Sequence, residues 1–154
     1  MKGTYVLIIR LGKNTEIRIG ALGNVKFTKG FYAYVGSGMN SLEKRIERHM
    51  KKRGKKKFWH IDYFLSTANA LGAISWESDS KDECGAAGSL SGNFEPVRGF
   101  GSSDCGCESH LFFSEKLQPI ENAAAKIRRS SLARRRPLRS QRSSASWISG
   151  SRSG

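Results

Sequence analysis

The chain has 154 residues, 38% of them hydrophobic, and a formal net charge of +14. This length allows one domain with a single core, and the charge predicts partners that carry phosphate or another anionic surface. The longest apolar stretch near the start, Val6–Ile9, is too short for a signal segment or a membrane span. We therefore expect a cytoplasmic protein with no membrane partner.

The first part of the chain is rich in predicted strands. Gly3–Leu11 is apolar almost throughout, which predicts a strand buried on both faces. A turn at Gly12–Asn14 leads to Thr15–Ile19, which alternates like a half-buried strand, so we interpret the pair as a hairpin. A short strand over Val25–Thr28 follows. Antiparallel strands with short loops before the first helix favour an α+β fold.

The stretch Gly30–His49 predicts a strand, a glycine turn and a basic helix. The strand contains Tyr32 and Tyr34 and ends in Gly36-Ser37-Gly38, where the backbone can turn sharply. Asn40 or Ser41 can cap a helix, in which Leu42, Ile46 and His49 or Met50 form an apolar stripe beside Lys44, Arg45 and Arg48. Such an arrangement offers a platform for phosphate.

Six cations follow within the seven residues Lys51–Lys57, directly before Phe58 and Trp59. A solvated loop is the simpler interpretation of a charge run. Cations beside aromatic side chains, however, suit phosphate neutralisation and base stacking, so we predict a nucleic-acid-binding surface. Its members are Lys44, Arg48, Lys51, Lys52, Arg53, Lys55, Lys56, Lys57 and Trp59.

After the run of cations, the sequence predicts a helix that begins near Trp59, a strand over Ala70–Trp76 and a helix over Asp79–Ser91. A glycine-rich loop, Val97–Cys107, then leads to a last strand, His110–Phe113.

The composition changes after Lys116. Residues 1–116 hold 18 basic and 12 acidic residues, whereas residues 117–154 hold 9 basic residues and one acidic residue. Beyond a helical turn or two over Glu121–Arg129, arginine and serine dominate and few apolar side chains are left to form a core. We therefore predict a domain over 1–116 and a basic tail over 117–154 that is disordered or foreign sequence.

Two tripeptides, Gly3-Thr4-Tyr5 and Tyr34-Val35-Gly36, with Arg45 nine residues after the second, resemble the GIY-YIG nuclease superfamily. Met1–Ser114 is more closely similar to a small, mostly archaeal branch, whose members occur alone or fused to endonuclease III-like repair glycosylases. Four stretches carry this similarity: Tyr34–Ser37, Trp59–Tyr63, Glu83-Cys84 and Gly99–Phe112. The resemblance implies a three-stranded antiparallel sheet flanked by helices, enlarged here by an inserted hairpin. It also implies a divalent-metal-dependent endonuclease that acts on DNA rather than RNA, in repair.

The resemblance further implies roles for single residues. Tyr5 accepts a proton from the attacking water, Tyr34 positions that water, Arg45 neutralises charge on the phosphate, and His49 assists. A glutamate on a later helix holds the metal, for which we choose Glu83 over its rivals Glu77, Asp82, Glu95 and Asp62. Oxygen ligands and a phosphate suit Mg²⁺ or Mn²⁺. The alternative is a nucleic-acid-binding module of the same fold that does no hydrolysis.

A further candidate site surrounds the glycine-rich loop. Cys105, Cys107 and His110 are three soft ligands within six residues, and Cys84 or His60 can supply a fourth. Their spacing is not of the C-x₂-C type, so we expect buried or reactive thiols rather than zinc. A regulatory protein that uses these thiols is a third hypothesis. His60 and Asp62, two residues apart, would share a face only on a strand. In the nuclease superfamily an asparagine usually follows the metal-binding glutamate, and Asp104 is a possible substitute for it here.

Overall fold

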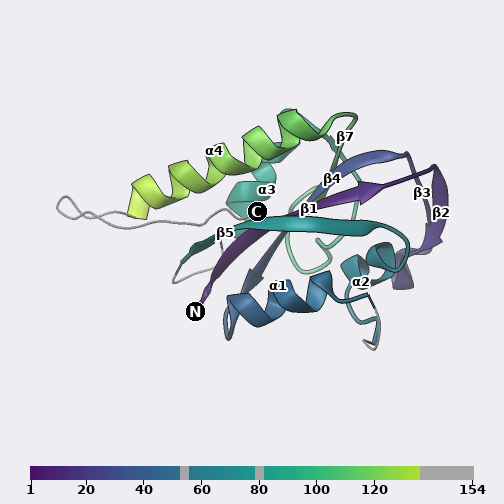
Figure 1. Cartoon of the computed structure of the whole chain (residues 1–154), viewed down its shortest axis with the longest axis horizontal. Coiled ribbons are helices and arrows are strands. Elements are labelled where there is room, and N and C mark those ends of the chain that lie inside the picture. Colours follow the sequence, from purple (N-terminus) through teal and green to yellow (C-terminus); the bar gives the residue numbers. More distant parts are fainter. Residues whose placement is uncertain (53–55, 79–81, 136–154) are drawn as a thin grey trace.

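A computed structural model describes residues 1–52, 56–78 and 82–135. Its centre is a five-stranded antiparallel sheet in the order β5-β1-β4-β7-β6 (Figure 1). The strands are β1 (Gly3–Leu11), β4 (Gly30–Gly38), β5 (Asn69–Glu77), β6 (Glu95–Pro96) and β7 (Leu111–Ser114). The predicted α+β class is confirmed, and the three central strands implied by the resemblance, β5, β1 and β4, are extended by β7 and β6.

The strand β1 is buried on both faces, as its apolar sequence predicts, because β4 and β5 flank it and helices cover both sides. The predicted hairpin between the first two strands is wrong for the same reason: both edges of β1 are occupied. Instead β2 (Thr15–Arg18) pairs with β3 (Asn24–Phe27) across the short 3-10 helix η1 (Gly20–Leu22), and this pair forms a separate two-stranded sheet.

Two helical layers enclose the central sheet. The helices α1 (Leu42–Met50) and α2 (His60–Leu65) cover one face, whereas α3 (Glu83–Ser91) and α4 (Leu117–Arg135) cover the other (Figure 1). Side chains of β1 alternate between the layers. Tyr5 and Leu7 join the core beneath α1 and α2, and Val6 and Ile8 join the core beneath α3 and α4.

The domain extends beyond the boundary that we predicted at Lys116. Residues 117–135 form the helix α4 and not a tail, and Ile120 and Ala124 are fully buried against the sheet. The apolar side chains recur at helical spacing in an arginine-rich segment, and burial of that stripe holds the helix in place. The rest of the predicted tail, 136–154, lies outside the described residues. Within the described helices, no segment is both long and apolar enough to cross a bilayer.

Candidate functional site

Two tyrosines and a histidine meet beneath α1. Tyr5 projects from β1 and Tyr34 from β4, and their ring centroids lie 6.4 Å apart. The ring of His49, from the last turn of α1, lies 5.4 Å from Tyr5 and 6.0 Å from Tyr34. A 2.5 Å hydrogen bond joins the Tyr5 hydroxyl to Nε2 of His49. The sequence-predicted Tyr5, Tyr34 and His49 are therefore neighbours in space.

Gly36 makes this approach possible. It lies opposite Tyr5 in the β1–β4 ladder, and a Cβ added there would collide with the phenol oxygen of Tyr5. On the other side, Gly101 adopts φ of 71°, and an added Cβ would lie 3.2 Å from Cε1 of Tyr34. Two backbone segments thus lie directly against the two phenol rings, at positions where only glycine fits without displacement.

Arg45 approaches the same place from α1. Ser41 caps this helix by accepting a hydrogen bond from the backbone N–H of Lys44, as the sequence predicts. Nη1 of Arg45 donates to the carbonyl oxygen of Ser37 at 3.0 Å, and the guanidinium lies 4.3 Å from the ring centroid of Trp59. The β4–β7 pairing ends at Tyr34, so β7 does not cover the edge of β4 at Ser37, where Arg45 bonds.

Glu83 reaches the end of β4 from the opposite layer. It is the first residue of α3, and its carboxylate accepts a 2.5 Å hydrogen bond from the Ser37 hydroxyl. Ser37 therefore contacts Arg45 through its carbonyl oxygen and Glu83 through its side chain. The sequence predicts a turn at Gly36-Ser37-Gly38, but Ser37 lies within β4, on the face opposite to Tyr34. We call Tyr5, Tyr34, Ser37, Arg45, His49 and Glu83 the tyrosine site.

Burial keeps both phenols neutral. Desolvation raises the pKa of Tyr5 well above its ordinary value, the Tyr34 phenol and the Glu83 carboxylate raise it further, and Arg45 opposes the shift. Burial also raises the pKa of Tyr34, the Glu83 charge adds to the shift, and Arg45 again opposes it. Near neutral pH both hydroxyls therefore keep their protons in the free protein.

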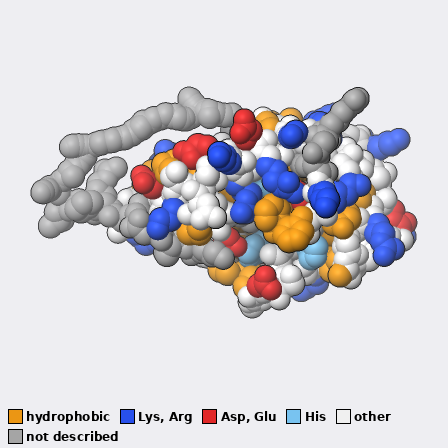
Figure 2. All heavy atoms as spheres, turned by 90° about the horizontal axis from the view of Figure 1, so that it is seen from below, with side chains coloured by type: hydrophobic (Ala, Val, Ile, Leu, Met, Phe, Trp, Pro, Cys, Tyr) orange, Lys and Arg blue, Asp and Glu red, His pale blue; other side chains and the backbone are white. Residues whose placement is uncertain are grey.

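The predicted nucleic-acid-binding cations divide into two groups. Arg48 forms a 2.7 Å ion pair with the buried Asp62, and Nζ of Lys52 donates to the carbonyl oxygens of Leu65 and Ala68. These two side chains support α2. Lys44, Lys51, Lys56 and Lys57 are exposed, and Arg53 and Lys55 lie outside the described residues. Lys and Arg side chains gather around hydrophobic ones on the face that carries α1 and α2 (Figure 2).

His60 and Asp62 have structural partners at the start of α2. Nδ1 of His60 accepts a 2.8 Å hydrogen bond from the backbone N–H of Gly101. Asp62 accepts backbone hydrogen bonds from Phe58 and Trp59 besides its ion pair with Arg48. Burial disfavours the Asp62 charge, but these donors outweigh it and lower the pKa of the carboxyl. Asp62 therefore orders the segment before α2, and His60 joins α2 to the glycine-rich loop.

The sequence profile of one protein family, described as a domain of unknown function, DUF123, matches residues 4–132. The chain belongs to the DUF123 family. No curated protein and no solved structure matches it. The DUF123 match spans every residue of the tyrosine site and nearly all of α4, so both are parts of the family's domain.

A second group of side chains converges beside the tyrosine site of this DUF123 domain. Potential ligand atoms of Cys84, Cys105, Cys107 and His110 all lie within 4.8 Å of one another, and we call these residues the cysteine–histidine cluster. Cys84 belongs to α3, and the other three residues belong to the loop before β7. Burial and the neighbouring thiols of Cys84 and Cys105 raise the pKa of Cys107 to about 12.

This cluster corrects the cofactor prediction. We predicted Mg²⁺ or Mn²⁺ and expected no zinc. Among the described residues, the group of side chains that converges as potential metal ligands consists of three sulfurs and an imidazole. Soft donors of this kind suit zinc and not Mg²⁺ or Mn²⁺. The sequence left Cys84 and His60 open as the fourth ligand, because both come from other elements, and the structure brings Cys84 to the cluster. Asp104, in the same loop, is exposed.

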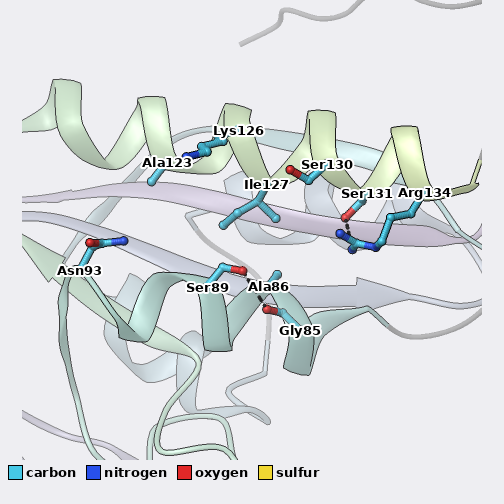
Figure 3. A pocket seen from close by; sticks show the side chains of 10 residues that line it. All are labelled: Gly85, Ala86, Ser89, Asn93, Ala123, Lys126, Ile127, Ser130, Ser131 and Arg134. Atoms are coloured by element: carbon cyan, nitrogen blue, oxygen red, sulfur yellow. Dashed lines mark hydrogen bonds between the residues drawn. The ribbon is translucent and has the colours of Figure 1, made fainter.

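A groove of about 360 Å³ lies between α3 and α4. Figure 3 shows Ile127 of α4 pointing toward α3, with Ser89 and Asn93 on the facing side. Arg134 donates to the Ser131 hydroxyl at one end of this groove. No sequence-predicted site residue lines it.

Proposed function

We propose that this DUF123 chain is an endonuclease of the GIY-YIG type that hydrolyses phosphodiester bonds in DNA. One observation carries the proposal: Tyr5, Arg45 and Glu83, from three elements far apart in the sequence, lie within electrostatic reach of one another at the end of β4, where Arg45 and Glu83 both bond to Ser37. Phenol, guanidinium and carboxylate are the groups that this chemistry needs.

Arg45 is suited to stabilise the charge that develops on the phosphate. Hydrolysis adds a water oxygen to phosphorus and breaks one P–O bond, through a transition state rich in negative charge. The guanidinium has five N–H donors, and one of its nitrogens bonds to Ser37. The guanidinium of Arg45 lies 4.3 Å from the Trp59 ring centroid, and this contact fixes its orientation. Its further N–H groups can then donate to phosphate oxygens.

The Tyr5–His49 pair is suited to take the proton of the attacking water. A phenol with a raised pKa is a poor base by itself. Nε2 of His49 lies 2.5 Å from the Tyr5 hydroxyl, so Tyr5 can pass its proton to the imidazole as it accepts one from water. The hydroxyl of Tyr34 would orient that water. The Glu83 carboxylate, bonded to Ser37, supplies the acidic group of the site.

A non-catalytic nucleic-acid-binding module is the second candidate. Two observations favour it: the Tyr5 side chain is only 1% exposed, and burial raises the pKa of both phenols. The exposed lysines after α1 would serve binding equally well without hydrolysis.

The two functions are separated by a nicking assay on supercoiled plasmid and on labelled branched, flapped and linear DNA, with divalent cations supplied one at a time. Tyr5→Phe removes the hydroxyl that bonds to His49. Tyr63→Phe is the matched control, because Tyr63 lies in α2 outside the tyrosine site.

We expect Tyr5→Phe to slow nicking by about 100-fold or more, while Tyr63→Phe nicks like the wild type and both variants bind DNA equally. A wild-type protein that binds these DNAs but cleaves none of them with any cation would overturn the endonuclease proposal and support the binding module.

A further inference from the structure

We propose that the cysteine–histidine cluster binds one zinc ion, held by Cys84, Cys105, Cys107 and His110. Three thiolates and an imidazole form a complete tetrahedral ligand set, which is typical of structural zinc sites.

The distances within the cluster fit such an ion. Zn–S bonds of about 2.3 Å at tetrahedral angles place two sulfur ligands about 3.8 Å apart. The four ligand atoms lie within 4.8 Å of one another, so shifts of about 1 Å or less would close the site. Sγ of Cys105 and Nε2 of His110 already lie 3.5 Å apart, close to the separation of two ligands on one zinc.

The backbone holds the ligand-bearing loop in place from both ends. The N–H of His110 donates to the carbonyl oxygen of Phe100, and the N–H of Gly99 donates to that of Glu108. Cys105 and Gly106 at the tip are exposed, so little apolar burial is available to order the tip by itself. A metal ion would supply this order, as it does in other small loops with zinc ligands.

Cys84 makes the ion a cross-link between two elements. It lies in the first turn of α3, 21 residues before Cys105, so zinc would fix the start of this helix against the loop before β7. The other ring nitrogen of His110, Nδ1, lies 3.9 Å from Oε1 of Glu83. A carboxylate next to the second nitrogen of a zinc-bound histidine is a common arrangement that fixes the ring. Zinc binding itself does not rest on the proposed function.

The first test measures metal content in the full chain, purified without chelators from medium that contains zinc. We expect about one zinc per chain in the wild type and in Ser103→Ala, an exposed serine of the same loop. The double variant Cys105→Ser/Cys107→Ser should lose the metal.

The second test uses the wild type alone, so it does not depend on whether the double variant folds. Chelation should expose three thiols to a thiol reagent, and added zinc should protect them again. Cobalt(II) added to the metal-free protein should give the charge-transfer absorption of thiolate ligands and tetrahedral ligand-field bands. Zinc should slow hydrogen exchange in residues 99–110 and at the start of α3 compared with the chelated protein.

Three results would overturn the proposal: less than about one zinc per ten chains with no cobalt spectrum, a disulfide between two of these cysteines, or an iron–sulfur chromophore. None of these measurements contains DNA. A failure of the zinc site is therefore distinguishable from a failure of the nuclease.

Discussion

Ser37 donates a hydrogen bond of 2.5 Å to the carboxylate of Glu83, and this contact joins β4 to the layer on the far side of the sheet from the tyrosines. The carbonyl oxygen of the same serine receives Arg45 from α1. The end of β4 thus collects groups from both helical layers, although Tyr5 and Glu83 belong to opposite ones.

Ser37→Ala tests this connection. Ser37 is buried, and the variant removes a hydrogen bond to a charged carboxylate, so we expect a loss of about 1.5 to 3 kcal/mol in the free energy of unfolding. If the proposed nuclease is correct, nicking should also fall. Urea unfolding measures the first effect, with Ser89→Ala as control because that exposed hydroxyl donates to the carbonyl oxygen of Gly85 in its own helix. Equal effects of the two substitutions would contradict a special role for Ser37.

Gly36→Ala should be strongly destabilising. The added Cβ would collide with the Tyr5 phenol, which is packed beneath α1 and bonded to His49. Overpacking of this kind costs about 1 to 3 kcal/mol in the free energy of unfolding, measured by urea denaturation. Gly88→Ala is the matched control: nothing lies within 4 Å of a Cβ added there, and alanine should stabilise α3 by up to about 1 kcal/mol. If both substitutions stabilise the protein, the close contact between Gly36 and Tyr5 does not exist.

Local sequence signals predict the parts of the fold that are local in origin. The helix α1 begins after its Ser41 cap and buries Leu42 and His49, as their spacing indicates. The partner of a strand is not local. The alternation in Thr15–Ile19 predicts a strand but does not show which strand it pairs with. It cannot pair with β1, because β4 and β5 occupy both edges of that strand. The arginine-rich composition likewise made it hard to recognise, from the sequence, the apolar stripe in α4 that contains Ile120 and Ala124.

The candidate sites show the same division. Tyr5, Tyr34, Arg45 and His49 were predicted as one group because short motifs carry a family resemblance, and they lie together. Ser37 and Cys84 gain their roles from tertiary contacts between β4, α3 and the loop before β7. No spacing in the sequence reports such contacts, so the sequence could not decide between Cys84 and His60 as the fourth ligand.

The Asp62 carboxylate should make stability fall in acid. Despite its burial, the backbone donors of Trp59 and Phe58 and the Arg48 ion pair lower the pKa of this carboxyl in the folded state. A depressed pKa contributes stability that is complete above the unfolded-state value of about 3.9 and is lost as the pH falls through the folded value below it. Urea unfolding at a series of pH values should therefore show a loss in this window for the wild type.

Asp62→Asn should be less stable at neutral pH by about 2 to 3 kcal/mol, because Arg48 loses its charged partner, and its stability should depend less on pH in the acid range. Asp104→Asn changes an exposed carboxylate of the glycine-rich loop and should keep the wild-type profile. An acid profile that is the same in Asp62→Asn and the wild type would show that other groups cause the loss.

Lys51 and Lys52 are adjacent but should respond differently to substitution. Both are exposed, but Nζ of Lys52 bonds to the carbonyl oxygens of Leu65, the last residue of α2, and of Ala68 after it. If the surface after α1 binds DNA, Lys51→Ala should flatten the plot of log affinity against log salt by about 0.9 for one lost phosphate contact, and unfolding should not change. Lys52→Ala should instead lower the free energy of unfolding by about 1 to 2 kcal/mol and keep the slope. Fluorescence anisotropy at several salt concentrations and urea denaturation separate the two. An unchanged slope in Lys51→Ala would remove that residue from the DNA-binding surface.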